Sequence, residues 1–105
     1  MKDFHWQKYA ECSCIETSQG SFHVRPHTFD AICVSPDYER PDIDTIIQFI
    51  KEQQRLHNSV LFIDVGANIG SYSIRIGNAF HAWNGLSIIA FEPFSSSYSL
   101  LFLLI

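Results

Sequence analysis

Basic residues, cysteines and long apolar runs are scarce in this sequence. Lys and Arg number 7 against 11 Asp and Glu among 105 residues, which gives a net charge of −4 at pH 7. The bases form no stripe that could follow a phosphate backbone, so we expect no nucleic acid partner. The apolar C-terminal run "LLFLLI" is far shorter than the ~18 residues of a membrane-spanning helix. The N-terminus also lacks an apolar h-region, so the sequence predicts neither a membrane span nor a signal peptide.

Cysteine is present in an odd number. The three thiols, Cys12, Cys14 and Cys33, leave one unpaired in any disulfide scheme, so we predict reduced cysteines and a cytoplasmic protein. The Cys12 and Cys14 pair has no second cluster at zinc-ligand spacing. We interpret His23 and His27 as solvated or core-edge side chains, and we predict no metal site.

The first forty residues differ in pattern from the rest of the chain. The overall composition, 47% hydrophobic and 17% charged, is that of one folded domain or part of one. Residues 9–34 mix β-branched and aromatic residues with turn formers, which predicts two or three short strands. The stretch "SPDYERPD" contains two prolines and predicts a loop. We therefore divide the chain into an N-terminal region, residues 1–40, and a second region, residues 41–105.

The second region alternates between helical and strand patterns. Asp42 predicts the N-cap of a helix over 43–57, whose isoleucines recur at helical spacing. The apolar run at 60–65 predicts a strand buried on both faces, and it is followed by a predicted helix over 69–82 and a similar strand at 86–91. A last helix is predicted after the serines of "PFSSSYSLLFLLI". A strand, a crossover helix and a strand form a βαβ unit, so we predict an α/β fold with a Rossmann-like parallel sheet.

Two acids stand at the carboxyl ends of the predicted strands, where parallel sheets bind ligands. Asp64 lies at the end of the first strand and Glu92 follows the second. Gly66 and Gly70 lie between them, in a loop where missing side chains let a ligand approach the backbone at a helix N-terminus. Glu92 comes 22 residues after Gly70, close to the ~20 typical of the acid that accepts ribose hydroxyls. The pattern indicates a small molecule that carries a nucleoside.

The same loop separates two classes of nucleoside cofactor. The dinucleotide fingerprint G-x-G-x-x-G is absent, because Asn68 occupies the place of its middle glycine. The Asp64 carboxylate would repel a pyrophosphate and attract a cationic group. S-adenosylmethionine carries a ribose, an ammonium and a sulfonium, so it meets these demands better than NAD does.

The stretches "FIDVGANIGSYSI" and "IIAFEP" resemble the FkbM-type S-adenosylmethionine-dependent methyltransferases, in which D-V-G-A-N-x-G and F-E-P are the two cofactor-binding signatures. The resemblance covers residues 41–105 and implies a sheet of the methyltransferase type, here incomplete. It implies that the methionine end of the cofactor is held by Asp64, Gly66, Ala67, Asn68 and Gly70. It also implies that the ribose is held by Glu92 and that the adenine is bordered by Phe91, Pro93 and Phe94.

The resemblance further implies methyl transfer to an oxygen of a small-molecule or glycan acceptor. The matched residues specify neither the acceptor nor the catalytic residues, which we expect beyond residue 105. The chain is thus interpreted as the N-terminal, cofactor-binding part of such an enzyme, inactive by itself. Two alternatives stay open: a noncatalytic fragment of such an enzyme, and an NAD(P)-binding oxidoreductase domain.

Three further interpretations concern packing. Tyr72 and Ser73 are interpreted as helix packing and polar surface. Residues 100–105 are expected to form an exposed apolar patch through which the isolated chain self-associates. A Cβ at Gly66 or Gly70 is expected to intrude on space that the cofactor or the packed helix occupies.

Overall fold

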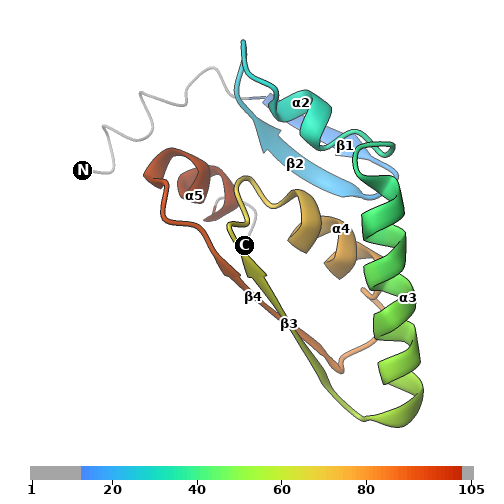
Figure 1. Cartoon of the computed structure of the whole chain (residues 1–105). Helices are drawn as coiled ribbons and strands as arrows, with labels where there is room; N and C mark the ends of the chain where they lie inside the picture. The colour runs from blue at the N-terminus through green and yellow to red at the C-terminus, as the bar shows by residue number, and fades with distance from the viewer. Residues whose placement is uncertain (1–12, 103–105) are drawn as a thin grey trace.

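The computed structural model describes residues 13–102, and Figure 1 shows how their helices and strands are arranged. Strands β1 and β2 pair antiparallel, and strands β3 and β4 pair parallel. In chain order the elements are β1 (Ser13–Thr17), β2 (Gly20–Val24), α2 (Asp30–Cys33), α3 (Arg40–Leu56), β3 (Val60–Val65), α4 (Ser71–Ala79), β4 (Leu86–Phe91) and α5 (Ser95–Phe102). The mixed α/β class predicted from the sequence is therefore confirmed.

The N-terminal strands form a hairpin. Thr17 stabilises its turn: the Thr17 hydroxyl donates to the Gly20 carbonyl at 3.1 Å and accepts from the Gln19 amide at 3.0 Å. Gly20 has a φ of 136°, which a side chain would disfavour. The prediction of short strands within residues 9–34 is confirmed for two of them, and residues 9–12 lie outside the described part of the chain.

Helix α3 begins at Arg40, so the prediction that Asp42 is its N-cap is wrong. Glu39 is the N-cap instead, with a φ of 48°, and its carbonyl accepts from the Asp42 and Ile43 amides, each at 3.1 Å. The two prolines led to the prediction of a loop up to residue 42. Pro41 instead falls in the first turn of the helix, where a missing N–H costs nothing. Asp42 lies in the same turn, where a carboxylate interacts favourably with the helix dipole.

The βαβ unit is formed by β3, α4 and β4. Both strands have the predicted bounds, and in their register Asp64 pairs with Ala90. Helix α4 is shorter than the predicted 69–82. Gly70 precedes it with a left-handed φ of 97°, and a turn begins at Phe80. Ile69 therefore lies outside the helix, in the loop that follows β3.

One face of the β3–β4 pair carries the larger apolar core. Helices α3 and α4 pack on this face, as Figure 1 shows. The core residues are Ile50, Ile76 and Phe80, packed against Ile46, Ile47, Val60, Phe62, Tyr72, Trp83, Leu86 and Ile88. The predicted isoleucine stripe of α3 is thus confirmed.

The opposite face of the pair is uncovered, so the prediction that both strands are buried on both faces is wrong. Burial alternates along each strand, and Val65 reaches 79% exposure. The apolar side chains of this open face are Leu61, Ile63, Val65, Ile89 and Phe91. The physical reason is that α3 and α4 both pack on the other face, and no other element among residues 13–102 takes this one.

A second apolar core lies between the hairpin and α4. Its buried residues are Phe22, Val24, Val34 and Ile69, with Ile15 and Ile74 packed against them. Helix α4 therefore lies between the hairpin and the sheet (Figure 1). Because Ile69 belongs to this core, the hairpin anchors the loop that follows β3.

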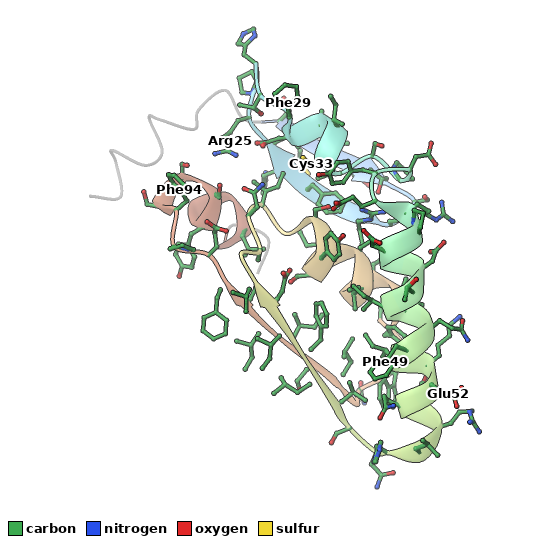
Figure 2. The ribbon with its side chains drawn as sticks, viewed as in Figure 1. Arg25, Phe29, Cys33, Phe49, Glu52 and Phe94 are labelled. Atoms are coloured by element: carbon green, nitrogen blue, oxygen red, sulfur yellow. The ribbon has the colours of Figure 1, made fainter. Side chains whose placement is uncertain are left out.

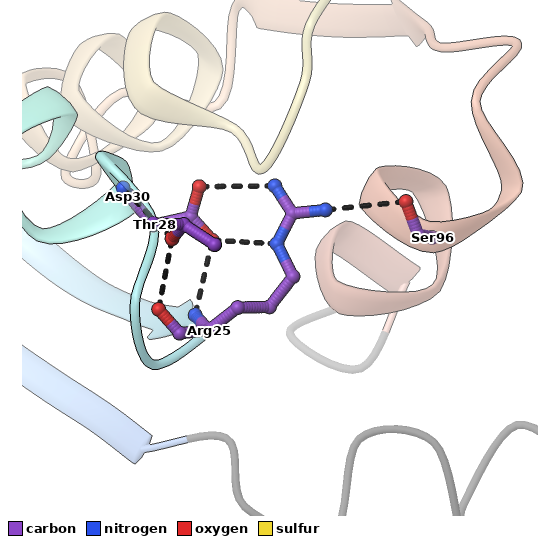
Figure 3. Close-up of polar contacts among 4 residues, drawn as sticks. All are labelled: Arg25, Thr28, Asp30 and Ser96. Carbon is purple, nitrogen blue, oxygen red and sulfur yellow. Dashed lines mark hydrogen bonds and ion pairs between the residues drawn. The ribbon is translucent and has the colours of Figure 1, made fainter.

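A polar cluster joins the hairpin to α5, as Figure 3 shows. The Arg25 guanidinium donates to both carboxylate oxygens of Asp30, at 2.7 and 2.9 Å, and to the Ser96 hydroxyl at 3.1 Å. Two backbone amides join the same cluster: the Arg25 amide donates to the Asp30 carboxylate, and the Asp30 amide donates to the Thr28 hydroxyl. Burial raises the pKa of the Asp30 carboxyl, but the bonds and charge of Arg25 outweigh it, and the pKa lies below its ordinary value.

We expect Asp30→Asn to lower the free energy of unfolding by about 1–3 kcal/mol at pH 7, because Arg25 loses a charged acceptor. The Asp30 side chain is 6% exposed but Arg25 is 23% exposed, so solvent screens part of the ion pair. Because the pKa of Asp30 is lowered in the folded state, its ionised carboxylate stabilises the fold at pH values above the ordinary pKa of 3.8. This stabilisation is lost as the pH falls through the folded-state pKa. Urea unfolding at neutral and acid pH should show the difference from wild type shrink in acid. Asp37→Asn, at an exposed position, is the control.

Candidate functional site

The two predicted acids lie at the carboxyl ends of adjacent parallel strands. Val65 pairs with Phe91, so Asp64 lies one pair before the end of the ladder and Glu92 follows it directly. The loop of residues 66–70 connects β3 to α4 at this same edge. The geometry thus brings the acids and the glycine loop to the edge of the sheet where α/β proteins bind ligands.

Four of the five N–H groups of the loop donate to protein acceptors. The Gly66 and Ala67 amides both donate to the Phe91 carbonyl, at 2.8 and 3.0 Å. The Asn68 amide donates to Oε1 of Glu92 at 2.7 Å, and the Gly70 amide donates to the Ala67 carbonyl at 2.9 Å. Four amides that could have held a phosphate are therefore already paired.

Three left-handed residues give the loop its shape. The φ angles are 80° at Gly66, 54° at Asn68 and 97° at Gly70. Glycine adopts this region freely, and asparagine tolerates it better than most residues do. The alternation explains why Asn68 can replace a glycine, and it turns the Asn68 amide toward Glu92.

Glu92 connects the loop to the start of α5. Its second oxygen, Oε2, accepts from the Phe94 amide at 2.9 Å, while Oε1 accepts from Asn68. An ionised carboxylate offers about four acceptor positions. Two backbone donors therefore orient Glu92 and leave it able to accept further hydrogen bonds, as a pair of ribose hydroxyls would require.

Asp64 is oriented by the helix that follows the loop. The Ser73 hydroxyl donates to Oδ2 of Asp64 at 2.6 Å. Ser73 is 7% exposed, so its interpretation as polar surface is wrong: the hydroxyl turns inward because the carboxylate accepts from it. Oδ1 of Asp64 has no hydrogen-bond partner among residues 13–102.

The two loop glycines differ in what surrounds them. A Cβ on Gly66 would meet no atom within 4 Å, whereas one on Gly70 would lie 2.7 Å from Leu101 and 2.8 Å from Ile74. Gly70 is favoured by its left-handed φ of 97° and is crowded by the ends of the Leu101 and Ile74 side chains, while Gly66 borders open space that a ligand could fill. A side chain at Gly66 would be disfavoured by its positive φ and not by a protein neighbour.

The C-terminal apolar run is only partly described. Leu101 is 5% exposed and packs on Gly70, so the prediction that it belongs to an exposed patch is wrong. The other side chains of residues 100–105 lie outside what the structure describes. Among the described residues, the open face of the β3–β4 pair forms an exposed apolar surface of this kind.

The residues expected to border the adenine lie at the surface. Phe94 is 73% exposed and stands beside the start of α5 (Figure 2). Phe91 is half exposed on the open face, and Pro93 between them is exposed. These three side chains are accessible to a ligand at the strand ends.

Tyr72 packs as the sequence predicted. Its ring joins the core between α3, α4 and the sheet, and its hydroxyl donates to Oε1 of Glu39 at 3.0 Å. Burial and then the bond to the Glu39 carboxylate raise the pKa of Tyr72 to about 12. The phenol is therefore protonated at neutral pH and serves to attach α4 to the start of α3.

Sequence reasoning missed Arg75, which is 1% exposed. Its guanidinium donates to the Gln19 side-chain oxygen and the Tyr38 carbonyl, each at 2.8 Å, and to the Pro36 carbonyl at 3.3 Å. Burial lowers the pKa of this group below its ordinary value. The only sequence signal was its place on the buried side of a helix between apolar residues. Through Arg75 the hairpin turn and the 35–39 loop fix the orientation of α4.

The described residues form neither a metal-binding cluster nor a membrane-spanning helix. Within residues 13–102, no three His, Cys, Asp or Glu side chains gather closely enough to hold a metal ion. None of the helices in that range combines the length and apolarity needed to cross a membrane. Comparisons of the chain with protein-family models, with curated proteins and with solved structures gave no significant match.

Proposed function

We propose that this chain is the cofactor-binding part of an S-adenosylmethionine-dependent methyltransferase of the FkbM type. The proposal rests on one observation: at the strand ends the donors of the loop are already paired, whereas acceptor oxygens of the two acids are still available. Four loop amides are paired within the protein, while Oδ1 of Asp64 and the remaining lone pairs of Glu92 can still accept. Such a site suits a ligand that donates hydrogen bonds.

S-adenosylmethionine is such a ligand, because its ammonium and its ribose hydroxyls are donors. Asp64 would take the ammonium and Glu92 the hydroxyls, with Gly66 leaving room between them. A dinucleotide instead needs free loop amides for its pyrophosphate. The paired amides therefore count against the NAD(P) alternative.

When bound, S-adenosylmethionine supplies an electrophilic methyl group, and an oxygen of a small-molecule or glycan acceptor would receive it. The residues described here would hold and orient the cofactor. The open face of β3–β4 fits a sheet that continues in a larger Rossmann-like domain, since parallel sheets are normally covered on both faces. The acceptor site belongs to that continuation in this proposal.

A titration followed by NMR tests the cofactor assignment. Adding S-adenosylmethionine to isotope-labelled chain should shift the amide resonances of residues 66–70 and of Glu92, because the ligand changes their surroundings. The method detects a Kd as weak as millimolar, about −4 kcal/mol, which suits a chain that provides only part of a sheet. Shifts with NADH and none with S-adenosylmethionine would favour the oxidoreductase. No shifts with either would leave a noncatalytic fragment.

A further inference from the structure

Ser73 lies in an unusual place for a buried hydroxyl. It is the third residue of α4, and its neighbours along the helix pack into both apolar cores. Serine is a weaker helix former than alanine, and in a helix it commonly bonds a carbonyl of the preceding turn. Here the hydroxyl instead donates to Oδ2 of Asp64 at 2.6 Å.

The bond fixes how the Asp64 carboxylate is turned. A carboxylate at a strand end rotates among several orientations, and a ligand that needs one of them loses affinity because it must immobilise the carboxylate. With Oδ2 bonded to Ser73, the carboxylate is already oriented. Oδ1 is then the oxygen that can accept from a cation.

We propose that Ser73 is a positioning residue that presents Oδ1 of Asp64 to the ammonium of S-adenosylmethionine. The inference rests on the proposed function and extends it, since Ser73 would affect how the amino-acid end of the cofactor is bound without touching the cofactor itself. It also separates Ser73 from a residue that only fills space, because a packing role would not depend on Asp64 or on the amino-acid end of the ligand.

Helix α4 offers a matched control in Ser71. Ser71 is 8% exposed and its hydroxyl donates to the Cys33 carbonyl at 2.6 Å. Ser71→Ala therefore removes a hydroxyl of the same burial and bond length from the same helix, with no bond to Asp64.

The test measures the Kd of two ligands by NMR titration of wild type and four variants: Ser73→Ala, Asp64→Asn, the double variant and Ser71→Ala. Methylthioadenosine is the second ligand, because it keeps the adenosine and lacks the amino-acid end. We expect Ser73→Ala to weaken S-adenosylmethionine binding about three- to tenfold, because the ligand must then immobilise the Asp64 carboxylate itself, and to leave methylthioadenosine unchanged. In the Asp64→Asn background the same change should have little effect. Ser71→Ala should match wild type with both ligands.

The outcomes separate this inference from the proposed function. Wild type that binds neither ligand overturns the proposed function and the positioning role together. Normal binding by wild type with an unchanged Ser73→Ala variant overturns the positioning role alone. Equal weakening for both ligands, or the same weakening with and without Asp64, assigns Ser73 to packing and also overturns it.

Discussion

Arg75→Met should lower the free energy of unfolding by about 3–5 kcal/mol, the largest effect expected of any single substitution here. Methionine fills similar space but leaves the Gln19 oxygen and the Tyr38 and Pro36 carbonyls without their donor. A buried acceptor that has lost its donor destabilises the folded state, because it has been removed from water without a hydrogen bond in return. For a domain of this size the loss corresponds to a decrease in Tm of roughly 12 °C or more.

Thermal and urea unfolding followed by circular dichroism provide the measurement. Arg55→Met is the control, because Arg55 lies on the exposed end of α3 and its partner Glu52 is also at the surface (Figure 2). That variant should change stability by less than about 1 kcal/mol. If Arg75→Lys unfolds like wild type, the charge alone suffices and the three-way bonding of the guanidinium does not matter.

The sequence predicted those elements whose signal is local. The strands at 60–65 and 86–91 have the predicted bounds, because each is an apolar, β-branched run that stops at a loop or turn. The helix predicted over 69–82 was too long, because Ile69 and Phe80 keep helical spacing without being helical. Ile69 follows the pattern for another reason, since it packs into the hairpin core.

The sequence could not predict features that depend on distant partners. The two acids of the site were predicted because the ends of the strands can be located from the sequence. In contrast, Ser73 bonds an acid nine residues away, and Arg75 bonds Gln19, 56 residues away. Apart from the place of Arg75 between apolar residues, nothing in the local pattern distinguishes these from a surface serine and a surface arginine. The open face of the sheet was missed because a mostly apolar strand that is covered on one face has the same sequence pattern as a strand that is covered on both.

Glu92→Ala should weaken binding of S-adenosylmethionine by about 1.5–3 kcal/mol, roughly ten- to hundredfold, because both ribose hydroxyls lose a charged acceptor. Methylthioadenosine carries the same ribose, so its affinity should fall by a similar factor. This result would contrast with Ser73→Ala, which should affect S-adenosylmethionine alone. NMR titration of both ligands measures it.

The structure adds a cost in folding that the position of Glu92 at a strand end does not reveal. Its carboxylate also holds the Asn68 and Phe94 amides, so Glu92→Ala should lower the free energy of unfolding by about 1–2 kcal/mol. Glu92→Gln keeps one acceptor oxygen and the side-chain shape, and should restore most of that stability while binding the cofactor less well than wild type. Glu52→Ala, at an exposed position on α3, controls for loss of an acidic residue. Unchanged affinity of Glu92→Ala for both ligands would refute the assignment of the ribose to Glu92 and leave this side chain as a structural link between the loop and α5.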